Sequence, residues 1–130
     1  MVILDLNGIC IERTVVFDVE TTGLSPRLGD RVIEIGAVAL NGEKIVDEFH
    51  SLIRVDQPIH PAAQRIHGIT EKMLSGQPRP EQVIPQFHVF IENSVLVAHN
   101  ANYDMMFMGS EFARLNLDFR NVFFCTLLSG

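Results

Sequence analysis

Two acidic residues near the beginning of the chain have types and spacing that could support chemistry. Asp18 and Glu20 follow a β-branched and aromatic run, T-V-V-F, and precede a T-T-G turn. Residues i and i+2 of a strand point to the same face, so the two carboxylates would lie side by side. Their repulsion would raise their pKa values unless a cation, most simply a divalent metal ion, lies between them. The structural alternatives are that Asp18 caps the turn and that Glu20 faces solvent.

A third carboxylate, Asp104, ends the sequence H-N-A-N-Y-D, which follows a compact apolar run at residues 94–98. We expect Asp104 in the first turn of a helix, where it could simply complement the helix dipole. If strand 94–98 lies beside the strand that carries Asp18, the three carboxylates converge at one edge of the sheet, where α/β folds tend to place their sites. An all-oxygen site of this kind suits Mg2+ or Mn2+ better than zinc.

The pattern of apolar residues predicts the elements that must position these side chains. Strands are expected at residues 14–18, 31–40, 44–55, 94–98 and 121–128. Helices are expected from residue 61 to about 67, at residues 71–74 and 80–92, and from about 100 to 115. Short turns between the first three strands predict an antiparallel meander, and the helical connections predict that the last two strands run parallel to the first. The expected class is therefore α/β with a mixed sheet.

The last helix is expected to bury one face, consisting of Tyr103, Phe107, Ser110 and Ala113. Residues 44–55 have a break in the phase of their apolar residues.

Two domain segments are expected. Residues 1–13 would form an N-terminal extension or an edge hairpin that turns at Asn7-Gly8, and residues 14–130 would form the main domain. A chain of 130 residues is long enough for one domain with a real core.

Composition limits the classes of function. No apolar run approaches the roughly 18 to 20 residues of a membrane span, and the N-terminus lacks the features of a signal peptide, so we expect a cytoplasmic protein without a membrane partner. The formal net charge of -6 argues against broad electrostatic adhesion to phosphates. A nucleic-acid partner would need a local basic rim, bound metal or an attached domain.

Three ordered motifs resemble those of the DEDDh, or DnaQ-like, 3'-5' exonucleases. They are F-D-V-E-T-T-G-L-S-P at 17–26, H-G-I-T at 67–70 and V-A-H-N-A-N-Y-D at 97–104. That family includes the proofreading subunits and exonuclease domains of bacterial replicative DNA polymerases. The resemblance covers residues 14 to about 128, and it implies an RNase H-like fold with a five-stranded mixed sheet.

The resemblance also implies roles for single residues. Asp18, Glu20 and Asp104 would bind two divalent cations, Mg2+ or Mn2+, for phosphodiester hydrolysis at a single-stranded 3' end, with DNA favoured over RNA. A DNA polymerase would be the protein partner. The residues that would hold the terminal nucleotide are Thr21, Thr22, Gly23, Leu24 and His67. The structural alternative for His67 is a hydrogen bond within the turn before Gly68.

The sequence departs from the family pattern in two places. Ala62 stands where some proofreading members carry an acidic residue, and no His follows His99, so the third motif with its general-base His and fourth acidic ligand is absent. We therefore expect a C-terminally incomplete fragment of a longer exonuclease, inactive or weakly active as it stands. A natural short form is the alternative origin, and a non-catalytic nucleic-acid or polymerase-binding module is the alternative function. An uncovered C-terminal sheet face would favour a homodimer.

Overall fold

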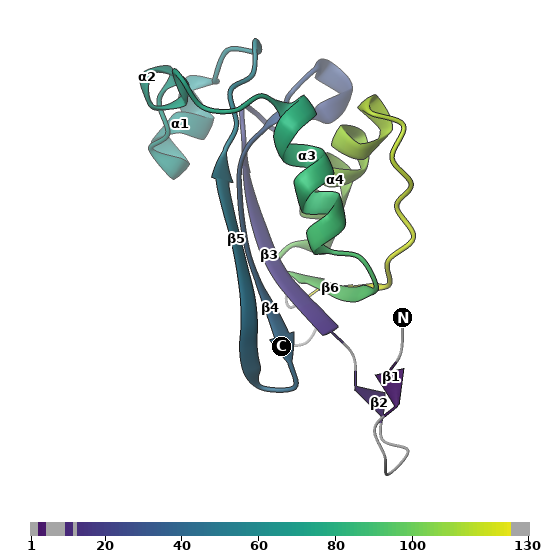
Figure 1. Ribbon diagram of the computed structural model, residues 1–130. Helices are drawn as coiled ribbons and strands as arrows, with labels where there is room; N and C mark the ends of the chain where they lie inside the picture. Colours follow the sequence, from purple (N-terminus) through teal and green to yellow (C-terminus); the bar gives the residue numbers. More distant parts are fainter. Residues whose placement is uncertain (1–2, 5–9, 12, 126–130) are drawn as a thin grey trace.

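A mixed sheet forms the centre of the molecule. The computed structural model describes residues 3–4, 10–11 and 13–125. The strands of the central sheet are β3 (Arg13–Thr21), β4 (Val32–Asn41), β5 (Lys44–Leu52), β6 (Ser94–Ala98) and β7 (Phe123–Cys125). Their order is β5-β4-β3-β6-β7, with β3, β4 and β5 antiparallel and with β6 and β7 parallel to β3 (Figure 1). The predicted α/β class with an RNase H-like mixed sheet is confirmed.

Helices cover one face of this sheet. They are α1 (Pro61–His67), α2 (Glu71–Leu74), α3 (Pro80–Phe90), α4 (Ala101–Arg114) and the short 3-10 helix η1 (Pro26–Leu28). Figure 1 shows α3 and α4 against one face, with α1 and α2 beyond one end of the strands. In the described part of the chain, α3 and α4 do not lie on the opposite face, which is called the open face below; at its end, Leu52 packs against the cluster that includes Leu74 of α2.

The N-terminal segment contains a second, small sheet. β1 (Ile3–Leu4) and β2 (Cys10–Ile11) pair antiparallel, apart from the central sheet (Figure 1). The expected turn at Asn7-Gly8 lies outside the described residues, and the boundary at residue 13 stays a prediction.

The main core lies between the covered face and the helices. Val15, Phe17 and Val19 alternate along β3 and are at most 3% exposed. Phe17 packs against Phe87 of α3, with ring centroids 5.8 Å apart. Because α3 and α4 bury the odd-numbered residues of β3, the even-numbered Asp18 points to the open face and remains exposed.

The first and third strands differ in length from the predictions. β3 continues through Thr21 because β4 pairs with it as far as Thr21 opposite Val32, so the acidic pair lies inside the strand. β5 ends at Leu52 instead of residue 55, and the backbone N–H of Arg54 donates to the carbonyl of Pro78 at 2.9 Å. The pairing of β4 with β5 is irregular between Ala39 and Leu40, whose partners are Asp47 and Ile45.

The predicted face of the last helix was partly wrong. Ala113 is exposed and Ser110 is only half-buried, whereas Glu111 is 2% exposed. Arg31 donates from Nε and Nη2 to the Glu111 carboxylate at 2.9 and 2.8 Å, and the N–H of Val32 donates to it at 3.1 Å. A charged side chain on the buried face was missed because apolar periodicity does not identify carboxylates that are paired inside the protein.

The final strand was predicted at residues 121–128. In the described part of the chain it covers Phe123–Cys125, and residues 126–128 lie outside that part. Val122, Phe123 and Phe124 beside this edge of the sheet are 62%, 45% and 60% exposed.

Candidate active site and nucleotide pocket

A pocket of about 390 Å³ opens at the carboxyl end of β3, between the loop that follows it and helix α1. Five residues expected to act in the site line this pocket: Glu20, Thr21, Gly23, Leu24 and His67. The other lining residues are Ser25, Leu28, Asp30, His60, Ala62, Ala63, Ile66 and Tyr103. The pocket is within the size range of small-molecule sites in proteins.

Apolar side chains stand exposed around the pocket. Leu24, Leu28 and Ile66 are 78%, 81% and 81% exposed although they are large and hydrophobic. Apolar side chains gathered at a concave site offer favourable burial to a flat apolar ligand such as a nucleobase.

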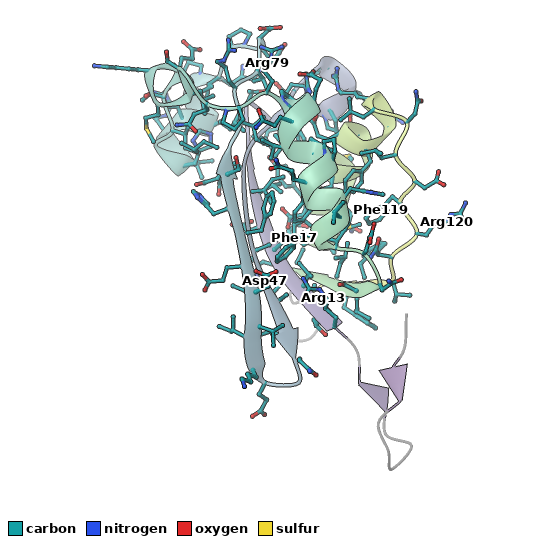
Figure 2. All side chains as sticks on the ribbon, viewed as in Figure 1. Arg13, Phe17, Asp47, Arg79, Phe119 and Arg120 are labelled. Carbon is teal, nitrogen blue, oxygen red and sulfur yellow. The ribbon has the colours of Figure 1, made fainter. Side chains whose placement is uncertain are left out.

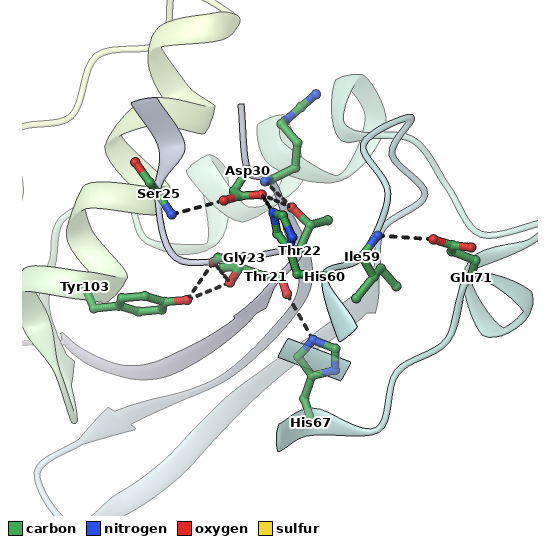
Figure 3. A network of polar contacts seen from close by, with 11 residues as sticks. Thr21, Thr22, Gly23, Ser25, Asp30, Ile59, His60, His67, Glu71 and Tyr103 are labelled. Carbon is green, nitrogen blue, oxygen red and sulfur yellow. Dashed lines mark hydrogen bonds and ion pairs between the residues drawn. The ribbon is translucent and has the colours of Figure 1, made fainter. Parts of the chain in front are cut away.

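Buried polar bonds hold the loop beneath the pocket. Thr22 is fully buried, and its hydroxyl donates to Asp30 Oδ1 at 3.0 Å and accepts from the N–H of Arg31 at 3.0 Å. The second carboxylate oxygen of Asp30 accepts from the N–H of Ser25 at 3.1 Å, and His60 Nε2 lies 3.5 Å from Oδ1 (Figure 3). Thr22 does not line the pocket, and its contacts support the loop from below.

Gly23 is required by close packing. A Cβ atom at this position would lie 2.5 Å from Asp30 Oδ2 and would also collide with the ring of His60. The absence of a side chain therefore lets the loop lie directly on the buried carboxylate.

His67 joins α1 to the end of β3. Its Nδ1 accepts from the N–H of Ile69 at 3.0 Å, so Nε2 carries the proton and donates to the carbonyl of Thr21 at 3.0 Å. The structural role suggested for this histidine, a hydrogen bond within its own turn, is present. The ring also lines the pocket, and its role toward a substrate stays a prediction.

Tyr103 reaches the same loop from α4. Its hydroxyl lies 2.6 Å from Thr21 Oγ1 and 3.2 Å from the carbonyl of Gly23 (Figure 3). Sequence analysis placed Tyr103 in the core and missed this contact. The position of Tyr103 directly before Asp104 could have predicted it. A tyrosine in the first turn of a helix can bury its ring and extend its hydroxyl beyond the core.

The three predicted carboxylates interact electrostatically but differ in environment. Burial raises the pKa of Asp104 to about 6, and repulsion from Asp18 and more weakly from Glu20 adds to the rise, while hydrogen bonds from the backbone of Asn100 and Val19 oppose it. Burial also raises the pKa of Glu20, with a further contribution from Asp18. The topology therefore brings the α4 carboxylate within electrostatic range of both β3 carboxylates.

The carboxylates do not share one cavity. Asp18 borders a shallow depression of about 330 Å³ on the open face, together with Val38 and His99. Glu20 faces the 390 Å³ pocket, and Asp104 is 2% exposed at the start of α4. The amide oxygen of Asn100 accepts from the N–H of Tyr103 at 3.4 Å and helps to fix this helix start.

The donor chemistry fits hard divalent cations, but the arrangement is not that of a preformed site. Three carboxylates whose charges repel one another would be stabilised by a cation with a preference for oxygen ligands. Across residues 13–125, however, no group of three His, Cys, Asp or Glu side chains is arranged so that it could hold a metal ion. A metal site would require these side chains to rearrange.

Sequence comparison gives the family directly. The RNase T-type family described as exonuclease matches residues 15–129. The chain belongs to this exonuclease family. The resemblance inferred from the three motifs is thereby confirmed.

Relatives of this exonuclease domain include replication proteins. The chain is 49% identical over 94 residues to the PolC-type DNA polymerase III of Thermotoga maritima, covering 72% of the chain and 7% of that protein. It is 45% identical over 95 residues to the DNA polymerase III subunit epsilon of Treponema pallidum, covering 73% of the chain and 44% of that protein. The chain thus spans less than half the length of either relative.

A solved structure shares the fold. Exonuclease X in complex with 5' overhanging duplex DNA is 32% identical to the chain, with a TM-score of 0.68, and the match covers 87% of the chain and 59% of that protein. Among the described residues of this exonuclease domain, no helix is both long enough and apolar enough to cross a bilayer.

Proposed function

We propose that this exonuclease domain removes nucleotides from the 3' end of single-stranded DNA by cation-dependent hydrolysis of phosphodiester bonds. The observation that carries the proposal is the position of Glu20, which lines the pocket and also interacts with Asp18 and Asp104 through its charge. A terminal nucleotide in the pocket would place its phosphodiester near these carboxylates.

The pocket would bind the nucleotide through its own residues. Leu24, Leu28 and Ile66 would bury the base, because their exposed apolar surfaces border the cavity. The hydrogen bonds from Thr22 and Ser25 to Asp30 would hold the loop in shape before substrate binds. A preorganised loop lowers the entropy cost of binding.

Asp18, Glu20 and Asp104 would hold two divalent cations, Mg2+ or Mn2+. The cations would activate water and stabilise negative charge on the phosphate and the leaving oxygen. Asp104 would have to lose its proton to contribute a full negative charge, and its pKa of about 6 places that loss below neutral pH.

The family and its relatives support the proposed polarity and substrate. The solved relative is in complex with 5' overhanging duplex DNA, and such a duplex presents a recessed 3' strand. The replication proteins among the relatives support DNA over RNA and a polymerase as partner, with proofreading as the cellular role.

The test is digestion of a single-stranded oligodeoxynucleotide labelled at its 5' end. With Mn2+ we expect a weak ladder of labelled products that shorten one nucleotide at a time, and no products with EDTA. Early release of a labelled mononucleotide would show 5'-3' polarity and overturn the proposal. A matched RNA oligonucleotide, expected to be cleaved more slowly, tests the preference for DNA.

Asp18→Asn should reduce the rate at least about a hundredfold, equivalent to about 3 kcal/mol of transition-state stabilisation. Asp47→Asn is the matched control, because Asp47 is an exposed acid on β5 outside the pocket lining. Mn2+ should raise the melting temperature of the wild type and of Asp47→Asn, but not that of Asp18→Asn. Equal rates for both variants would remove Asp18 from the mechanism.

A second candidate function is a non-catalytic nucleic-acid or polymerase-binding module. The observation that favours it is that Asp18, Glu20 and Asp104 do not share one cavity. The same digestion decides between the two, because a binding module would retard the oligonucleotide in a gel without shortening it in Mn2+.

Self-association through the open face stays a prediction. The exposed Phe123 and Phe124 of β7 and the preceding Val122 add apolar surface at one edge of the sheet. Sedimentation equilibrium on the whole chain tests it, and a single monomeric species across a wide concentration range would contradict it.

A further inference from the structure

Three oxygen atoms from two distant segments meet at the pocket. Thr21 Oγ1 lies 2.7 Å from the carbonyl of Gly23 and 2.6 Å from the hydroxyl of Tyr103, which in turn lies 3.2 Å from the same carbonyl. Figure 3 shows the phenol extending from α4 to the loop. Residues 82 positions apart in the sequence are therefore linked at the pocket wall.

The two hydroxyl protons allow one favoured arrangement. If Tyr103 donates to Thr21 and Thr21 donates to the carbonyl of Gly23, both protons occupy the two shortest contacts. The opposite direction between the hydroxyls would leave Tyr103 to donate across the longer contact. A tyrosine phenol ionises only near pH 10, so Tyr103 has its proton to donate at neutral pH.

The surroundings hold the phenol in place. The ring of Tyr103 packs against Phe107 with centroids 4.9 Å apart, and α4 begins only two residues before it. The next residue, Asp104, is the carboxylate that interacts with Asp18. In the first turn of α4, Tyr103 therefore contacts the pocket loop, and the next residue, Asp104, interacts electrostatically with Asp18.

We propose that the hydroxyl of Tyr103 is a positioning group, which fixes the loop at residues 21–23 on α4 and so sets the pocket for the terminal nucleotide. Tyr103 acts through Thr21 and takes no part in bond breaking. The part of this inference that concerns nucleotide binding rests on the proposed function, whereas the part that concerns the loop does not.

The test uses Tyr103→Phe, which removes the hydroxyl and keeps the ring on Phe107. Affinity for deoxythymidine monophosphate, the kind of product the proposed reaction releases, is measured by NMR titration of the whole chain. We expect binding to weaken about fivefold, which corresponds to about 1 kcal/mol. A residue that only stabilised the fold would lower the unfolding free energy and leave the affinity of the folded chain unchanged.

Thr21 and Ser51 supply matched variants. Thr21→Val, which removes the intermediate hydroxyl, should weaken binding at least as much as Tyr103→Phe, and Thr21→Ser should restore it. Ser51→Ala removes another hydroxyl that donates to a carbonyl, at 2.8 Å to Leu52, on β5 outside the pocket lining, and it should bind as the wild type does. Wild-type affinity in Tyr103→Phe would overturn the inference.

Amide exchange tests the loop without any nucleotide. The N–H of Ser25, which donates to Asp30, should exchange about fivefold faster in Tyr103→Phe because the loop is held less firmly. If the wild type fails to bind the nucleotide, the proposed function fails, and the exchange rates alone decide the inference. Unchanged exchange would then overturn it.

Discussion

The two faces of β3 use neighbouring residues for different purposes. On the covered face, Val15, Phe17 and Val19 are at most 3% exposed and pack beneath α3 and α4. On the open face, Asp18 is exposed, and Asp18 and Glu20 carry charges that repel each other. The same strand therefore carries residues that stabilise the core and carboxylates whose mutual repulsion destabilises the fold.

The pocket and the acidic group also differ in the electrostatic environment of their polar side chains. Around the pocket, Thr22, Asp30 and His67 each have hydrogen-bond partners, and the described residues contain no buried side-chain nitrogen or oxygen without one. At the acidic group, burial and the charge of Asp18 instead raise the pKa values of Glu20 and Asp104. The pocket is built before ligand arrives, whereas the acidic group would need a cation to reach its lowest energy.

A pair of truncations on β6 should make the difference between the faces measurable. Leu96 is 1% exposed on the covered face, whereas Val97 is half-buried on the open face. Phe17, which is labelled in Figure 2, lies on the covered face. Leu96→Ala should lower the unfolding free energy by about 3 to 4 kcal/mol through lost burial and a cavity. Val97→Ala should cost about 1 kcal/mol or less, because part of its surface is already in water. Urea unfolding measures both, and equal costs would mean that the open face is covered in solution.

Protonation of Asp104 should make stability depend on pH. Its pKa rises from 3.8 to about 6 in the folded state, so the folded chain binds more protons than the unfolded chain between those values. The unfolding free energy should therefore fall as pH rises through this window, by about 2 to 3 kcal/mol in total. Asp104→Asn should lack this fall and should be the more stable protein at neutral pH.

The measurement is urea unfolding in EDTA at pH values below, within and above that window. Mn2+ should reduce the difference at neutral pH, because a cation would favour the ionised carboxylate in the wild type alone. A wild-type unfolding free energy that rises with pH across the window would contradict the assignment of Asp104 as a buried acid with a raised pKa.

The smallest effect is expected from the ion pair between His50 and Glu34. His50 Nε2 lies 2.7 Å from Glu34 Oε2, but the histidine side chain is 64% exposed. His50→Ala should change the unfolding free energy by less than about 0.5 kcal/mol, because solvent screens exposed pairs. A larger loss would indicate that this part of the sheet is shielded from water.

Sequence patterns predicted the presence of strands and helices better than the residues at which they begin and end. Alternation in β3 and helical spacing in α3 are local consequences of which face is buried, so both elements were found. The continuation of β3 to Thr21 depends on pairing with Val32 of another strand, which local pattern does not encode. The same reason explains why the buried Glu111 was missed, since its partner Arg31 lies 80 residues away.

By itself, the sequence determined the family, the α/β class and the identity of the acidic residues, because these depend on residue type and order along the chain. Only the tertiary structure decided that Thr22 supports the loop from below, that Tyr103 touches it from α4 and that Asp104 is buried near Asp18. Those properties arise from contacts between segments that are far apart in sequence, and burial and charge repulsion act through distance in space.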